Sequence, residues 1–142
     1  SIYGLTLNGN PIGEIAQWAL YHGAMGLPMI YLTGEEDACA EAEALIPGIT
    51  TVPVKKGLSR ESAVSVSKEK ARALIRSGAI AALQAHRDTP VAPLVWKGPF
   101  VLEKRYFHTH DVDRYDGVTH AERIDGQTVR ITGDDIRQIV YV

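Results

Sequence analysis

Three short apolar runs, each followed by a helical pattern, occupy the first 88 residues, and this alternation restricts the fold more than any other feature. The runs lie near residues 2–7, 28–32 and 50–55 and have the composition and turn-forming boundaries of strands. Strands that alternate with helices usually pair in parallel, through right-handed crossovers. The pattern therefore predicts an α/β fold, with a layered sheet of parallel type and flanking helices.

The helical patterns that follow these runs have recognisable ends. Ser67 is expected to be the N-cap of the longest helix. Thr33 and Glu36 have the T-x-x-E spacing of a capping box, which predicts the start of the second helix. Pro53 lacks a backbone N–H, so the third strand is predicted at or near a sheet edge. The expected helices are 12–26, 35–46 and 67–88.

Beyond residue 88 the pattern changes. Residues 89–97 contain Pro90 and Pro93 and are predicted to be a connector. The following residues contain an alternating strand, "FVLEKRYF", a hairpin around Asp125-Gly126 and a short final helix in "GDDIRQIVYV". We therefore expect an α/β core over residues 1–88 and a smaller α+β lobe over residues 98–142.

Charge and composition exclude some classes of partner. The net charge of −2 gives no broad positive surface, which argues against nucleic acid and anionic membranes as partners. No apolar run approaches the ~18 residues of a membrane span. We expect a cytoplasmic location, because no targeting signal is visible. The single cysteine, Cys39, lies among alanines and is predicted to be a small buried residue.

Glu14 is the first candidate for chemistry. It lies in the first turn of the first predicted helix, where a carboxylate interacts favourably with the helix dipole. It also follows the carboxyl end of a predicted parallel strand, which is where α/β folds place their binding sites. From the residues alone, a helix-dipole role and a metal-ligand role both stay open.

Two further clusters carry polar side chains. His108, His110 and Asp111 form an H-x-H-D pattern with donors that suit zinc, although a solvated polar loop is the favoured interpretation. Lys55 and Arg60 could bind a carboxylate or phosphate, but a solvated strand end is the commoner case for such residues. The roles of these residues stay open at this point.

The first two thirds of the chain contain a specific series of short motifs. These are "NGNPIGE" at 8–14, "GLPMIYLTGEE" at 26–36, "EAE" at 41–43, "VK" at 54–55 and "SRESAV" at 59–64. This series resembles the zinc-dependent D-aminopeptidases of the DppA-like metallopeptidase family, and "ERIDGQTVRITGDDI" resembles the closing segment of that family more weakly.

The resemblance implies a zinc cofactor and one ligand. In the family, an Asp-x-Glu pair and two histidines from the first half of the protein bind zinc together with the Glu of the G-E motif. Gly13-Glu14 matches that motif, so Glu14 is the metal ligand that the resemblance implies. The other ligands have no counterpart here, so the chain resembles the C-terminal half of such an enzyme. One departure is Gly34-Glu35, where relatives usually have Gly-Asp.

The first residue, Ser1, stands directly at the head of a predicted strand. We expect this end to result from processing of a precursor, which makes Ser1 a candidate catalytic nucleophile with its free amine as base. The favoured function is an amide or peptide hydrolase subunit that completes a metal site with an N-terminal half. It would act on small peptides or amides and form homo-oligomers. The alternatives are an N-terminal-nucleophile amidohydrolase and a non-catalytic structural subunit.

Overall fold

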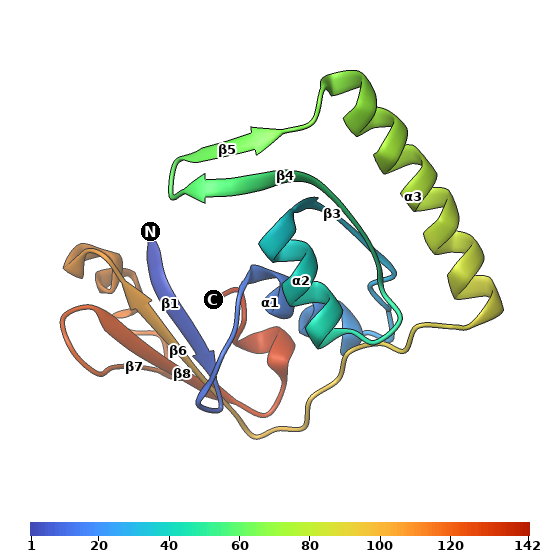
Figure 1. The fold of residues 1–142 in the computed structure, drawn as a ribbon. Helices are drawn as coiled ribbons and strands as arrows, with labels where there is room; N and C mark the ends of the chain where they lie inside the picture. The colour runs from blue at the N-terminus through green and yellow to red at the C-terminus, as the bar shows by residue number, and fades with distance from the viewer. The chain divides into compact units, whose positions relative to one another are not determined.

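The computed structural model describes residues 1–142, and the chain folds into two compact units. Residues 1–24 and 95–142 form the terminal unit, and residues 25–94 form the central unit. Each unit has its own sheet and its own helices (Figure 1). None of the helices combines the length and the apolar character that crossing a membrane requires.

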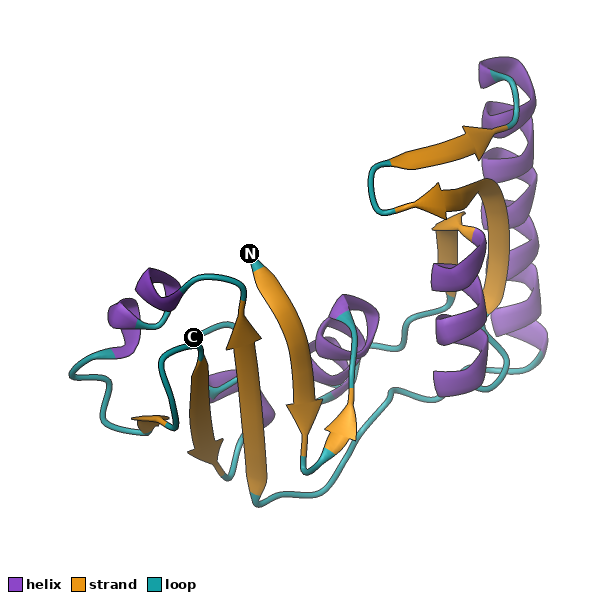
Figure 2. Cartoon of the chain, turned by 60° about the vertical axis from the view of Figure 1, so that its left-hand side comes forward, coloured by secondary structure: helices purple, strands orange, loops and turns teal.

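The terminal unit is built on an antiparallel sheet of five strands (Figure 2). The strand order is β2 (Asn10–Pro11), β1 (Ile2–Leu7), β6 (Phe100–Tyr106), β8 (Thr128–Gly133) and β7 (Ala121–Arg123). The unit also contains helix α1 (Glu14–Gly23) and the 3-10 turns η1 (Thr109–Asp111), η2 (Asp113–Tyr115) and η3 (Ile136–Gln138).

Strand β6 shows how this sheet buries one face. Its side chains alternate, so that Phe100, Leu102 and Tyr106 are buried while Val101 and Arg105 are exposed. The inward face continues onto the neighbouring strands and onto the elements that cover them. The other buried residues of this core are Leu5, Leu7, Ala16, Ala19, Leu20, Val112, Val129, Ile131, Ile136, Ile139 and Val140.

The central unit has a sheet of three strands, in the order β3 (Tyr31–Glu35), β4 (Thr50–Ser59) and β5 (Ser62–Ser65). Strands β3 and β4 are parallel and are joined through helix α2 (Glu36–Leu45), whereas β4 and β5 form an antiparallel hairpin. Helix α3 (Lys68–Asp88) follows β5.

The two helices of the central unit pack on opposite faces of its sheet. Thr51 of β4 donates a hydrogen bond to Glu43 of α2, whereas the next side chain, Val52, lies against Gly78 of α3. Successive side chains of a strand point to opposite faces, so α2 and α3 must lie on different sides. This is the layered βαβ arrangement that the sequence predicts, confined to residues 25–94.

One prediction about the sheet is wrong. The sequence predicts that the strand at 2–7 joins the parallel sheet, but β1 lies in the terminal unit and pairs antiparallel with β6. The physical reason lies in its pattern. Leu5 and Leu7 are buried while Ile2 and Tyr3 are exposed, and such a half-buried strand suits an antiparallel sheet with one solvated face.

The compact units also divide the chain at other places than the predicted boundaries at 88, 97 and 98. The first 24 residues belong to the same unit as the predicted C-terminal lobe and not to the predicted core, because β1 pairs with β6. The connector 89–97 is split between the units, because the boundary along the chain falls between residues 94 and 95. A division of this kind depends on a pairing between residues about a hundred positions apart, which local sequence patterns do not encode.

The predicted element ends are confirmed in part. Ser67 is the N-cap of α3, and its side chain accepts a hydrogen bond from the Lys70 N–H at 3.3 Å. The predicted hairpin is confirmed by the pairing of β7 with β8. The capping box is not formed, because the N-cap of α2 is Glu35 and the Thr33 hydroxyl donates to the Val52 carbonyl instead. The predicted final helix is reduced to the single turn η3.

Candidate active site

A cavity of about 590 Å³ opens in the terminal unit. Apolar, aromatic and charged side chains share its wall, and they come from β1, α1, β6, η2 and the segments around them. The lining residues are Ile2, Glu14, Gln17, Trp18, Lys104, Arg114, Tyr115, Val118, Val140, Tyr141 and Val142.

Glu14 is the one acidic side chain of this wall. It is exposed and stands in the first turn of α1, after the N-cap residue Gly13, which provides no capping side chain. The carboxylate therefore lies at the positive end of the helix dipole. It makes no hydrogen bond or ion pair with other side chains of the chain. Burial, followed by the negative charge of Glu14, raises the pKa of Tyr141, which places the two side chains near one another.

The chain by itself does not assemble a metal centre. No three His, Cys, Asp or Glu side chains are grouped in a way that could hold a metal ion. A catalytic zinc site typically uses about three protein ligands and keeps one position open. Glu14 is the one His, Cys, Asp or Glu side chain in the cavity wall, so this wall presents a single carboxylate.

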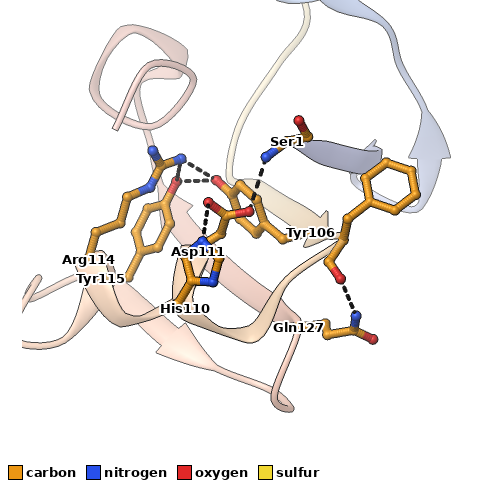
Figure 3. A network of polar contacts seen from close by, with 8 residues as sticks. Ser1, Tyr106, His110, Asp111, Arg114, Tyr115 and Gln127 are labelled. Atoms are coloured by element: carbon orange, nitrogen blue, oxygen red, sulfur yellow. Dashed lines mark hydrogen bonds and ion pairs between the residues drawn. The ribbon is translucent and has the colours of Figure 1, made fainter.

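Two residues of the cavity wall, Arg114 and Tyr115, form a polar network with the buried Tyr106. Figure 3 shows this network. The hydroxyls of Tyr106 and Tyr115 are 2.6 Å apart, and Arg114 Nη2 lies 2.6 Å from the first and 3.2 Å from the second. Tyr115 donates its hydrogen to the main-chain oxygen of Val142 at 3.0 Å. Tyr106 must therefore be the donor in the bond between the two hydroxyls.

Lys104 also lines the cavity and lies near the two tyrosines. It occupies an inward position of β6 and is only 4% exposed. Its ammonium group donates to the Val140 carbonyl at 3.2 Å and to the main-chain oxygen of Val142 at 2.8 Å. A buried ammonium needs such partners, since leaving it unpaired would cost several kcal/mol. Burial nevertheless lowers the pKa of Lys104.

The shared protons shift the pKa values of the two tyrosines in opposite directions. Burial and donation to Tyr115 raise the pKa of Tyr106 to about 12. Burial acts on Tyr115 in the same sense, but acceptance from Tyr106 and the charge of Lys104 outweigh it and lower its pKa. The bond to Tyr106 in turn raises the pKa of Arg114, so the guanidinium is charged at every relevant pH.

Ser1, the predicted nucleophile, lies outside the set of side chains that line the cavity. Its amino group is 3.0 Å from Asp111 Oδ2, and this hydrogen bond lowers the pKa of the Asp111 carboxyl. The amine is therefore engaged by the Asp111 carboxylate in this arrangement.

The predicted histidine cluster does not gather metal ligands. The rings of His108 and His110 are stacked, with centroids 5.4 Å apart and planes 8° apart. His110 Nε2 lies 3.9 Å from Asp111, but its side chain is 75% exposed and no further donor completes a site. The favoured interpretation of a polar loop leading into a short 3-10 turn agrees with this geometry.

The remaining sequence candidates belong to the central unit. Lys55 is an exposed residue of β4, near the β4–β5 hairpin that contains Arg60. Cys39 is 3% exposed, and burial raises the pKa of its thiol, so the prediction of a small buried residue is confirmed. Neither group lies in the terminal unit that carries Glu14.

The comparisons with known proteins agree with this architecture. The chain belongs to peptidase family M55, the D-aminopeptidases, which it matches over residues 1–142. The predicted family is thereby confirmed.

Two relatives illustrate how much of the family fold the chain contains. A D-aminopeptidase of Bacillus subtilis (strain 168) is 36% identical over 78 residues, which are 55% of this chain and 28% of that protein. The structure of the Zn-dependent D-aminopeptidase DppA from Bacillus subtilis, described as a self-compartmentalizing protease, matches with a TM-score of 0.85 and 26% identity. The match covers 98% of this chain and 50% of DppA, so the chain spans about half the length of that relative.

Sequence reasoning found Glu14 but missed Lys104, Arg114 and the tyrosine pair. One signal was available. In "FVLEKRYF" every second residue from Phe100 is apolar or aromatic except Lys104, which marks a charged side chain on the buried face of a strand. Arg114 and Tyr115 carry no comparable signal, because their meeting with Tyr106 depends on how the segment after β6 folds back.

Proposed function

We propose that this chain supplies part of the active site of a zinc-dependent peptide or amide hydrolase of the aminopeptidase type. The observation that carries the proposal is Glu14, an exposed carboxylate without a partner that faces the cavity from the first turn of α1. Membership of the D-aminopeptidase family and the likeness to a Zn-dependent member support the reaction class and the metal.

The site needs a second contributor. Glu14 fits zinc as a single carboxylate ligand, and the other ligands are proposed to come from the N-terminal half of the family fold. When bound, zinc polarises the scissile carbonyl and lowers the pKa of its bound water. The role of this chain is to hold one ligand in place and to border the substrate with the apolar side chains of Ile2, Trp18 and Val118.

The test compares Glu14→Gln with Glu69→Gln in this chain assembled with the N-terminal half. Glu69 is the matched control, because it is an exposed glutamate in the first turn of α3. We expect Glu14→Gln to lower both the zinc content, measured by inductively coupled plasma mass spectrometry, and the rate of dipeptide hydrolysis. Glu69→Gln should change neither. If zinc and turnover both survive Glu14→Gln, Glu14 is only a helix-dipole residue.

Assembly into a homo-oligomer is part of the same proposal. The related DppA is described as self-compartmentalizing. The central unit exposes the apolar side chains of Leu58 and Val64 on its hairpin and Leu83 on α3, with exposed fractions of 64%, 58% and 64%. Exposed apolar side chains of this kind are typical of interfaces. Light scattering during size-exclusion chromatography measures the mass, and a monomer at all concentrations would contradict this part.

Ser1 as nucleophile is the competing mechanism. A chelator separates the two, because removal of zinc abolishes a metal-dependent reaction and leaves an N-terminal-nucleophile reaction intact. Full activity after chelation, lost in Ser1→Ala, would favour Ser1. The position of Ser1 outside the cavity lining, with its amine paired to Asp111, supports the metal-dependent alternative.

A further inference from the structure

Arg114 has no acidic partner, although acidic residues surround it in the sequence. Its neighbours Asp113 and Asp116 both bind Arg123, at 2.6 and 3.3 Å. Arg130 and Arg137 of the same unit likewise each pair with a carboxylate. Arg114 instead contacts the neutral hydroxyls of Tyr115, in the wall of the cavity, and of the buried Tyr106. No Asp or Glu side chain of the chain therefore pairs with its positive charge.

The guanidinium is nevertheless held in one position. Nη2 donates to both tyrosine hydroxyls, and the guanidinium carbon lies 5.1 Å from the centroid of each ring. These contacts restrict a side chain that would otherwise lose much conformational entropy on binding a ligand. The N–H groups on Nε and Nη1 remain without partners, and Arg114 is exposed at the cavity. The arrangement is a preorganised site for an anion.

We propose that Arg114 binds the free carboxylate of a short peptide and so makes this protein prefer substrates with an unblocked C-terminus. The ammonium group of Lys104 lies in the same wall and adds positive potential, while Glu14 lines the same cavity with the opposite charge. A short peptide with its reacting end toward Glu14 and its carboxylate on Arg114 matches both charges. The preference among substrates rests on the proposed function, whereas the binding of a carboxylate by Arg114 does not.

A carboxylate suits this wall better than a phosphate does. Phosphate sites usually combine several charge-assisted donors around the anion. Here one guanidinium is accessible, because the Lys104 ammonium is buried and already donates to the main-chain oxygens of Val140 and Val142. The rest of the wall is largely apolar, with Ile2, Val118 and Val140 beside the charged groups. Such a wall fits the side chains of a peptide.

The first experiment measures binding without turnover. The protein, assembled with its N-terminal half and freed of metal by a chelator, is titrated in a calorimeter with N-acetyl-alanyl-alanine and with the corresponding C-terminal amide. Removal of metal prevents the carboxylate from binding to zinc. We expect the acid to bind about ten- to hundredfold more tightly than the amide, as for a charge-assisted hydrogen bond. Inorganic phosphate should compete more weakly than the acid.

Variants assign the preference to Arg114. Arg114→Gln should abolish the difference between acid and amide, and Arg114→Lys should retain part of it. Arg76→Gln is the control, since Arg76 is an exposed arginine of α3 in the other unit. Equal binding of acid and amide by the unmodified protein would overturn the proposal whether or not the variants fold. So would a preference that survives in a folded Arg114→Gln variant, or tighter binding of phosphate than of the acid.

The second experiment uses the zinc-loaded protein and compares alanyl-alanine with alanyl-alanine amide. Arg114→Gln should raise KM for the acid about tenfold or more and leave KM for the amide and both kcat values nearly unchanged. A fall in kcat for both substrates would show a structural role instead. If the protein shows no hydrolysis at all, the proposed function fails, while the metal-free titration still decides whether Arg114 binds a carboxylate.

Discussion

The carboxylate of Glu35 accepts a hydrogen bond from the backbone N–H of Gly57 at 2.9 Å, and this contact ties the end of β3 to β4 just beyond Lys55, the register partner of Glu35. The register of the two parallel strands shifts between Gly34 and Glu35, so the side chain reaches along β4 from an irregular position. A Cβ atom at Gly57 would overlap with Glu35 Oε1. The sequence therefore uses a glycine where the carboxylate needs access to the backbone.

Gly57→Ala should destabilise the protein by about 1–2 kcal/mol, because the Glu35 carboxylate must withdraw and leave the residue 57 N–H without its acceptor. Urea unfolding measures the change. Gly34→Ala is the control, since a Cβ there has no neighbour within 4 Å. In a Glu35→Ala background, Gly57→Ala should cost much less, because the conflicting group is gone. Equal costs in the two backgrounds would contradict this interpretation of the contact.

Glu35→Asp tests the length of the same side chain. One methylene less would prevent the carboxylate from reaching the Gly57 N–H at its present distance. We expect a loss of about 1 kcal/mol in the free energy of unfolding. Glu35→Gln keeps the length and an acceptor oxygen, so it should lose less than Glu35→Asp. The reverse order of the two variants would show that charge, and not reach, decides the contribution.

Much of the central unit could be predicted from the sequence, because its contacts are local. The order of β3, α2 and β4 follows from adjacent patterns, and the Ser67 cap of α3 is formed within one turn. The place of β1 could not be predicted in this way. Its partner β6 begins 93 residues after the end of β1, and the helical pattern that follows β1 suggested a parallel neighbour instead.

The residues of the candidate site could likewise be predicted only in part from the sequence. Glu14 was recognisable because a short motif and the first turn of a helix both point to it. Arg114 was not, because its significance lies in what it lacks. Only the structure shows that Arg123 occupies the nearby carboxylates and that the two tyrosines come from segments on either side of η1. Hydrogen bonding between such segments leaves no periodic trace in a sequence.

Asp135 should stabilise the protein in a pH-dependent way. It is the N-cap of η3, and hydrogen bonds from the side chain and backbone of Arg137 lower its pKa to about 2. The folded pKa lies below the unfolded value of 3.8, so the contribution is complete above that value and is lost as the pH falls toward 2.

The difference in unfolding free energy between the unmodified protein and Asp135→Asn should therefore shrink between pH 4 and pH 2. Chemical denaturation at several pH values measures it. Asp134→Asn is the matched control, as Asp134 is the adjacent exposed carboxylate and makes no ion pair. A difference that does not change over this range would show that the cap acts only through its uncharged hydrogen bonds.

At alkaline pH the ionisation of the buried Tyr106 should lower the stability of the folded protein. Burial and donation to Tyr115 raise the pKa of Tyr106 to about 12, above the ordinary value of 10.0. An acid whose pKa is raised by folding stabilises the native state below its unfolded pKa, and this contribution is lost as the pH rises from 10 to about 12.

Tyr106→Phe removes the titrating hydroxyl. The advantage of the unmodified protein over Tyr106→Phe should then fall across this range by roughly 1–3 kcal/mol, in unfolding experiments at fixed ionic strength. Tyr3→Phe is the control, because Tyr3 is a tyrosine of the same unit that is 64% exposed. Should the advantage over Tyr106→Phe stay constant up to pH 12, the hydroxyl of Tyr106 does not retain its proton in the folded protein, and the direction of donation in the tyrosine pair would have to be reversed.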